Sequence, residues 1–408
     1  MMRYYKLLNI LSTHALLAML VSSGLSQDQG TNFTFHFDPL SGENANLGGI
    51  LFPRFYAIGT FGALESGAEA TDFASNEHDP QKDAAFQNVE ASVLLKINDK
   101  LVGRITAFGQ EGAEEWSAEV EEYFLRYNFS PAVTLGGGQF LNFFGFQSHR
   151  HLHGWDFVNN NLANSRLINE GELITQGGHL ILKHPDEFAM LTIGAGGVRT
   201  HAHEHEEEEG HDDDHHLEAD SANFNSWVAT ADLKWALVED GAAMGTASFG
   251  MGENGFGEMT YLYGFGIQKV WGGRDSGHGY QELAPGAFMI RSEFIGRSFD
   301  AVEIHEDDGE IERHEFDEQG VSTNLFYGLS DTTKLSFRHD FVSGIEALET
   351  PDYHRLSPSL TTRIGASKRF QTRIQYDYND SDGHGEEHVG WLQLQYQWGG
   401  TVGGYFRD

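Results

Sequence analysis

Cysteine is absent from all 408 residues, and several other features of common protein classes are scarce. Without disulfides, a secreted chain of this length must be held by its own hydrogen bonds and packing, which argues against a small disulfide-stapled module. Basic residues are also few, because 26 Lys and Arg stand against 61 Asp and Glu, a net charge of -35. Such a charge disfavours nucleic acid as a partner and favours cations.

Long apolar runs are missing after the first residues of the chain. Residues 7–21 are largely apolar, follow the basic residues Arg3 and Lys6, and precede the small residues Gly24 and Ser26. This order is typical of a secretory signal, so we expect a cleaved signal peptide at residues 1–26. No later segment approaches an apolar run of about 18 residues, and the remaining sequence therefore predicts no membrane-spanning helix.

What the sequence does have is an alternation of residue types with period two. In residues 258–271, EMTYLYGFGIQKVW, large apolar residues alternate with small or polar ones. This alternation predicts a β-strand with one apolar face. About sixteen such segments occur, near residues 50–61, 85–97, 101–110, 116–128, 132–142, 172–184, 188–198, 223–236, 242–251, 258–271, 284–297, 319–329, 333–343, 355–367, 369–379 and 388–398.

The connections between these segments alternate between short and long. Turn-forming residues fill the short connections, such as INDKL and LSDTT. The long connections are rich in acidic residues and are expected around residues 62–84, 143–171, 199–222, 298–318, 344–354 and 380–388, with shorter ones at 111–115 and 252–257. The connection at 271–283 fits poorly, because it should be a short turn and is long.

This pattern predicts an all-β fold, a transmembrane antiparallel up-and-down barrel with short periplasmic turns and long extracellular loops. The strands have the required length and alternating faces, and the long loops lie on one side. A soluble two-sheet sandwich also alternates, but it gives no reason for every long loop to lie at one end. We expect a periplasmic N-terminal segment at 27–49, the barrel at 50–398 and a C-terminal tail at 399–408. The expected location is the bacterial outer membrane, in contact with lipid and lipopolysaccharide after insertion by the barrel-assembly machinery.

Residues 201–216, HAHEHEEEEGHDDDHH, consist almost entirely of histidines and carboxylates. Histidine-rich tracts are typical of metal binding, because neutral imidazole suits Zn, Cu and Ni. The candidate ligands are His201, His203, His205, His211, His215 and His216. The alternative is an acidic loop that only solvates the surface, and composition does not separate the two.

The loop at 143–171 is the third and longest on the long side. In trimeric general porins the third external loop folds into the lumen, so by analogy this one is expected to form a constriction. His149, His151 and His153 lie on one side of an extended backbone. With Asp156 they form a candidate tetrahedral zinc site. The alternative is that these histidines bond to side chains of the barrel wall and fix the loop.

This loop also carries a resemblance to a known family. Residues 136–162, GGGQFLNFFGFQSHRHLHGWDFVNNNL, and residues 120–131, VEEYFLRYNFSP, resemble Gram-negative outer-membrane porin-like proteins with His-rich loops. That family is associated with uptake of zinc or other metals and is distantly similar to phosphate-selective porins. The matching positions are Gly138, Gln139, Phe140, His151, His153, Trp155, Asp156, Phe157, Val158 and Leu162. The sequence departs from the family pattern at Asn161, where proline is expected.

The resemblance implies a channel, and a homotrimer, as in the trimeric general porins, is one possible assembly. Phosphate transport does not carry over, because Arg150 and Arg166 are the only Lys or Arg residues in the loop. We expect a cation-preferring channel whose loops bind and concentrate divalent metal, zinc first, for passage into the periplasm. A general or sugar-permeable porin and a barrel-anchored surface metal scavenger are the alternatives. No required cofactor and no enzymatic activity are expected, since Ser276 and His278 lack triad spacing.

Overall fold

The computed structural model describes residues 35–36, 45–64, 78–80, 83–111, 116–186, 188–199, 219–238, 242–272, 283–304, 311–348, 350–365, 369–381 and 385–399. Residues 1–35 and residues 36–408 are two separate units, and the second contains the sixteen long strands described below. The predicted signal peptide, the histidine tract at 201–216, and Ser276 with His278 lie outside the described residues.

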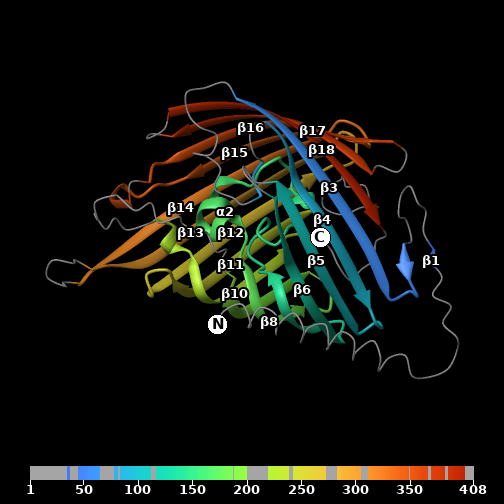
Figure 1. Ribbon diagram of the computed structural model, residues 1–408, viewed down its shortest axis with the longest axis horizontal. Helices are drawn as coiled ribbons and strands as arrows, with labels where there is room; N and C mark the ends of the chain where they lie inside the picture. Colours follow the sequence, from blue (N-terminus) through green and yellow to red (C-terminus); the bar gives the residue numbers. More distant parts are fainter. Residues whose placement is uncertain are drawn as a thin grey trace. The chain divides into compact units, whose positions relative to one another are not determined.

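Sixteen long strands form an antiparallel sheet that closes on itself (Figure 1). Each strand pairs with its neighbour in the chain, and the last pairs with the first, from Val389↔Leu64 to Gly399↔Arg54. The predicted up-and-down barrel is therefore confirmed. Its strands are β3 (Leu51–Leu64), β4 (Asp83–Lys96), β5 (Leu101–Glu111), β6 (Trp116–Ser130), β7 (Val133–Leu141), β8 (Ile174–Lys183), β9 (Ala189–Val198), β10 (Phe224–Ala236), β11 (Ala243–Asn254), β12 (Met259–Trp271), β13 (Phe288–Ile304), β14 (Ile311–Gly328), β15 (Thr333–Val342), β16 (Tyr353–Ile364), β17 (Phe370–Ser381) and β18 (Gly385–Gly399), preceded by the two-residue strands β1 (Phe35–His36) and β2 (Asn46–Leu47).

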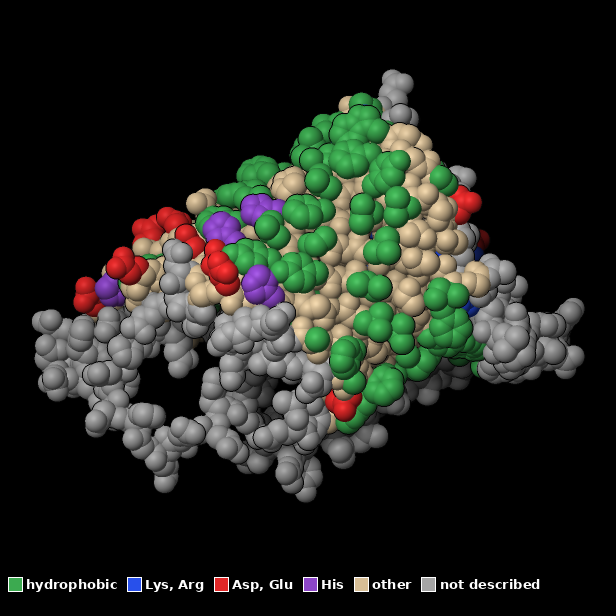
Figure 2. All heavy atoms as spheres, turned by 90° about the horizontal axis from the view of Figure 1, so that it is seen from above, with side chains coloured by type: hydrophobic (Ala, Val, Ile, Leu, Met, Phe, Trp, Pro, Cys, Tyr) green, Lys and Arg blue, Asp and Glu red, His purple; other side chains and the backbone are tan. Residues whose placement is uncertain are grey.

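The two faces of the barrel wall differ in polarity as the alternation predicts. In β12, Phe265 and Ile267 are 60% and 51% exposed on the outer face, whereas Thr260 and Gln268 are buried on the inner face. Figure 2 shows apolar side chains spread over the wall, with acidic and histidine side chains gathered toward one side of it. A closed barrel with an apolar exterior and a polar interior is the architecture that spans the bacterial outer membrane, which is where this chain resides. Among the described residues, no helix has the length and apolar character needed to cross a membrane.

The observed strands overlap the sixteen predicted segments one for one, and the largest difference lies in the expected loop at 298–318. There β13 and β14 continue as a hairpin that pairs as far as Ile304↔Ile311. The expectation of a long loop was wrong because it relied on apolar alternation. Beyond the pair Arg297↔Glu318 the strands carry many charged residues, and the hairpin is held by backbone pairing and by a small apolar cluster that includes Phe299 and Phe316. Residues 273–282 of the unusually long connection lie outside the described part of the chain.

The short helical segments lie mostly in one connection. Between β7 and β8 the chain forms η2 (Leu152–Gly154), α2 (Leu162–Leu167) and η3 (Asn169–Gly171); η4 (Ala219–Ala222) and η6 (Glu346–Leu348) lie in other loops. Leu162, Leu167 and Ile168 pack with inward-facing wall residues such as Leu262 and Ile295 in a buried apolar cluster. The apolar core of this barrel is therefore inside the lumen, between the loop and the wall.

Candidate functional site

The constriction loop, defined here as residues 142–173, is folded into the barrel and is largely buried. Figure 1 shows α2 surrounded by the strands. Glycines on the inner face of β12 make room for the loop: a Cβ atom at Gly264 would lie 2.8 Å from the ring of Phe144, and one at Gly266 would lie 2.7 Å from the ring of Phe146. The small-residue face of β12 is thus the surface against which the loop packs.

The loop turns into the lumen at Gly145. Its φ of +63° is in the left-handed region that glycine adopts without strain. The Gly145 amide donates hydrogen bonds to Asp232 Oδ1 at 3.0 Å and to Ser248 Oγ at 2.9 Å. The next amide, of Phe146, donates to Glu293 Oε1 at 2.8 Å. Buried wall side chains therefore satisfy the backbone of a turn that has no sheet partner of its own.

Asn161, where the resembling family has proline, caps the helix α2. Its side-chain Oδ1 accepts a hydrogen bond from the amide of Asn164 at 2.8 Å. Asparagine and proline both favour the start of a helix, asparagine as the N-cap residue and proline in the first turn. At this position the chain therefore starts α2 with an N-cap side chain, where the resembling family has proline.

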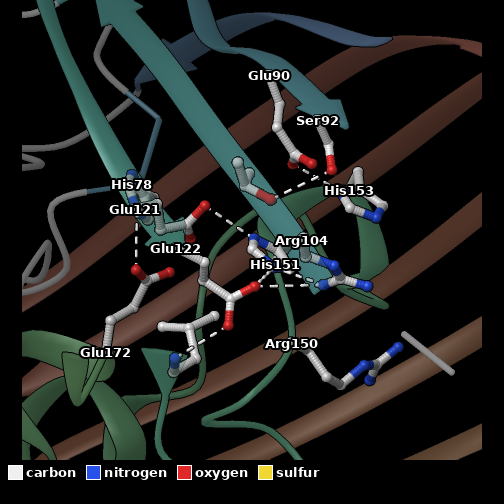
Figure 3. Close-up of polar contacts among 12 residues, drawn as sticks. His78, Glu90, Ser92, Arg104, Glu121, Glu122, Arg150, His151, His153 and Glu172 are labelled. Atoms are coloured by element: carbon white, nitrogen blue, oxygen red, sulfur yellow. Dashed lines mark hydrogen bonds and ion pairs between the residues drawn. The ribbon is translucent and has the colours of Figure 1, made fainter. Parts of the chain in front are cut away.

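One side of the loop faces what we call the acidic wall: Glu90 on β4, and Glu121 and Glu122 on β6. His151 lies between the two β6 carboxylates, with Nδ1 2.8 Å from Glu121 Oε2 and Nε2 2.9 Å from Glu122 Oε2 (Figure 3). His153 places Nδ1 2.7 Å from Glu90 Oε2. The loop histidines therefore form ion pairs or hydrogen bonds with the wall, depending on their protonation.

The charge state of the loop histidines follows from these partners. Burial opposes protonation of His151, but Glu121 and Glu122 outweigh it and raise its pKa well above the usual histidine value. His149 has the opposite environment: burial, Lys234 and Arg150 lower its pKa well below the usual value. Near neutral pH, His151 is therefore a cation held by carboxylates, and His149 is a neutral imidazole.

The other side of the loop faces a basic wall on β13 and β15–β17. Arg291 and Lys334 both bind Asp156, at 2.9 Å and 2.7 Å, and Arg150 of the loop itself binds it at 3.0 Å. Asp156 is buried, which would raise its pKa, but these three cations lower the pKa well below the usual value. A single carboxylate thus ties the centre of the loop to two strands of the wall.

The remaining basic side chains of this wall bind backbone carbonyls of the loop. Arg373 donates to the carbonyl oxygens of Trp155 and Phe157, both at 2.8 Å. Arg338 and Arg355 donate to the next carbonyls along the loop, of Asn159 at 2.9 Å and Asn160 at 3.1 Å. These guanidinium groups satisfy four carbonyls between residues 155 and 160, in an irregular segment of the loop.

The four candidate ligands of the predicted zinc site are therefore distributed between different partners. The rings of His151 and His153 stack 5.7 Å apart beside the acidic wall. Asp156 is bound to the basic wall, and His149 has Nε2 3.5 Å from Lys234 Nζ. In this geometry the four side chains fix the loop to the wall, and zinc binding by them stays a prediction.

A part of the site that sequence reasoning missed comes from the first long loop, at residues 78–80. His78 Nε2 lies 3.1 Å from Glu172 Oε2, at the end of the constriction loop, and Asp79 Oδ1 accepts from the amide of Asn160 at 2.8 Å. Burial raises the pKa of Asp79 to about 6. The sequence places His78 and Asp79 in the long acidic loop expected at 62–84, and nothing in it indicates that they turn toward the lumen. Within the described residues, the group of ligand-type side chains that converges is His78, Glu121 and Glu172, with ligand atoms within 4.8 Å of one another.

Comparison with known proteins agrees with this architecture. No protein-family model and no curated protein matches the sequence. Among solved structures, the outer-membrane channel DcaP of Acinetobacter baumannii matches with a TM-score of 0.54 and 11% identity over 85% of this chain and 96% of that one. A loop L8 deletion mutant of OmpT, an outer-membrane protein of Vibrio cholerae, matches with a TM-score of 0.51 and 10% identity over 85% of this chain and 99% of that one. The chain is thus similar in fold to outer-membrane porins, at a distance where sequence similarity is small.

Proposed function

We propose that the protein is a porin-like outer-membrane channel that prefers cations and whose His- and acid-rich loops concentrate divalent metal, zinc first, for passage into the periplasm. It acts as a channel, without enzymatic activity, and we expect a homotrimer. The fold supports the channel, and the resemblance in residues 120–162 supports the metal.

The observation that carries cation preference is the distribution of charge along the constriction loop. The basic wall is occupied: Arg291 and Lys334 bind Asp156, and Arg373 binds loop carbonyls. On the acidic side, four carboxylates, of Glu90, Glu121, Glu122 and Glu172, are paired with three histidines and Arg104. The net charge of -35 adds a field of the same sign, which raises the local concentration of cations.

Reversal potentials across a salt gradient test this proposal. The purified barrel in a planar bilayer should favour potassium over chloride, and the preference should fall at high salt, where the Debye length shrinks to about 3 Å at 1 M. Glu90→Gln combined with Glu122→Gln should reduce the preference, whereas the exposed Glu386→Gln serves as the control. Anion preference of the unaltered channel would contradict the proposal.

A general or sugar-permeable porin with solvating loops, and a surface metal scavenger, are the alternatives. Calorimetric titration with zinc distinguishes them from the main proposal, because a histidine tract binds several ions weakly and a formed site binds one ion tightly. Deleting residues 202–214 should remove the weak class. If the deletion leaves zinc binding unchanged, the tract only solvates the surface and the general porin takes precedence; zinc binding without ion conductance favours the scavenger.

A further inference from the structure

The junction of the first long loop, the acidic wall and the end of the constriction loop brings together one imidazole and two carboxylates. We propose that His78, Glu121 and Glu172 bind one divalent transition-metal ion, for which zinc is the best match, and that the bound ion fastens the constriction loop to the wall. This goes beyond the proposed function, because neither cation preference nor metal capture by the outer loops requires a built site in the lumen.

The three ligands come from different parts of the chain and are all buried. His78 belongs to the loop between β3 and β4, Glu121 to β6, and Glu172 to the last residues before β8 (Figure 3). Their side chains are 2%, 4% and 9% exposed. One ligand atom from each lies within 4.8 Å of the other two. A tetrahedral zinc ion with bonds of about 2.0–2.2 Å separates its ligand atoms by about 3.4 Å, so small side-chain rotations would complete the site.

The hydrogen bonding at the junction is incomplete without a cation. Glu172 Oε2 faces His78, but the buried Oε1 of the same carboxylate has no hydrogen-bond partner. His78 Nδ1 lies 3.0 Å from Gln110 Oε1, which is an acceptor, so Nδ1 donates there. In the neutral imidazole, Nε2 then directs a lone pair at the Glu172 carboxylate, and two acceptors 3.1 Å apart repel each other. A metal ion between them accepts both lone pairs and removes the conflict.

The surroundings of Glu121 resemble the outer shell of a metal centre. Its Oε2 accepts from His151 Nδ1 at 2.8 Å, and His151 Nε2 in turn faces Glu122 at 2.9 Å. Such hydrogen bonds orient a carboxylate ligand and tune its basicity. Imidazole together with two carboxylates suits zinc and neighbouring transition metals, whereas calcium and magnesium prefer all-oxygen sites. A water molecule would complete four-coordination.

The site is placed where occupancy affects the constriction loop. His78 is followed by Asp79, which binds Asn160, and the carbonyl of His78 and that of Val158 share the donor Gln87 Nε2, at 2.9 Å and 2.8 Å. A metal that joins His78 to Glu172 therefore connects the first loop to both the middle and the end of the constriction loop. Zinc binding should accordingly slow hydrogen exchange of the loop amides.

The test is a zinc titration of the full chain, refolded in detergent, in competition with a chelator that suppresses weak sites. We expect one tight ion per chain. Loss of an outer-shell partner typically costs 10–100-fold in metal affinity, so loss of a ligand in His78→Gln or Glu172→Gln should cost at least about 100-fold. The matched control is His153→Gln, which removes a buried histidine of the same lumen that is paired with one carboxylate.

Each outcome decides the proposal. Tight binding that survives His78→Gln but is lost in His153→Gln overturns it in favour of the sequence-predicted group around His149 and Asp156. Absence of tight binding in the unaltered chain also overturns it, and leaves a protonated His78 as the group that faces Glu172. Cation selectivity, measured without zinc, is unaffected by either result and tests the proposed function separately.

Cobalt, as a substitute for zinc, keeps the proposal testable if a variant fails to fold. Tetrahedral cobalt absorbs visible light much more strongly than six-coordinate cobalt, so the unaltered chain with one equivalent should show the intense bands. Only the weak six-coordinate spectrum would contradict a tetrahedral site at this junction. Affinity should also fall on acidification, because the His78 ligand must be neutral.

Discussion

Replacing Asp156 by asparagine should release the centre of the constriction loop while leaving the barrel intact. The carboxylate binds three cationic groups, from Arg150, Arg291 and Lys334, and is itself buried. Asparagine has nearly the same shape, but it carries no charge and offers one acceptor oxygen instead of two. The substitution therefore leaves three buried cations without their common counter-charge.

The size of the effect follows from the cost of unpaired buried charge. Removing one partner of a buried ion pair typically costs about 3–5 kcal/mol. Since 1.4 kcal/mol corresponds to a factor of ten, the ratio of displaced to seated loop should rise by about 10²–10³-fold. The strands pair through backbone hydrogen bonds around the whole barrel, so the loss should remain local to the loop.

Hydrogen exchange by mass spectrometry measures this directly. Peptides that cover residues 150–168 should exchange about 10²–10³ times faster in Asp156→Asn, strand peptides should be unchanged, and single-channel conductance should increase. The control is Asp186→Asn, because Asp186 is 86% exposed in a short turn. Unchanged protection of the loop in Asp156→Asn would refute the reasoning that this carboxylate holds it.

Three further perturbations test other parts of the structure. Because Glu121 and Glu122 raise the pKa of His151, its ion pairs with them stabilise the loop fully below the unfolded histidine pKa of about 6.5. This stabilisation is lost as pH rises through the pKa of His151 in the folded protein, so alkaline pH should loosen the loop. Faster hydrogen exchange of the loop on mild acidification would contradict this. Gly145→Ala places a Cβ atom against Glu293 at a positive φ, so it should destabilise the loop by more than the about 1–2 kcal/mol that backbone strain alone would cost. Gly286→Ala is the control, because Gly286 also has a positive φ but has open space around it, so only the backbone strain acts there. Equal losses of thermal stability in the two variants would refute the clash. The folded barrel should change its gel mobility on heating, and a chain that is soluble without detergent would contradict the membrane assignment.

The strands could be predicted from the sequence because each one is a local pattern. In residues 258–271 the alternation alone identifies which side chains meet lipid, and Phe265 and Ile267 are indeed exposed. The folding of the third long loop into the lumen could be expected only by analogy with general porins. The hairpin at 298–318 was missed because its charged residues carry no apolar signal, although their backbone pairs as far as Ile304↔Ile311.

The partners of the loop could not be predicted, because they are distant in sequence. Asp156 meets Lys334, 178 positions away, and Arg373 reaches the carbonyl of Trp155, 218 positions away. The sequence groups Asp156 with the histidines because they are neighbours along the chain, but it does not show which wall each side chain faces. In the barrel this segment contains the 3-10 turn η2. Its side chains reach opposite walls, so that His151 pairs with carboxylates and Asp156 pairs with cations.

The separation of acidic side chains on β4–β6 from basic side chains on β13 and β15–β17 makes the interior of the barrel electrically asymmetric from one side to the other. Between such walls a solute experiences a torque as well as an attraction, because its positive end is drawn to one side and its negative end to the other. We therefore expect a zwitterion in the lumen to align with this field, with its ammonium group toward β4–β6 and its carboxylate toward β13. Two solutes of equal net charge but different dipole moments should then differ in how readily they pass the loop.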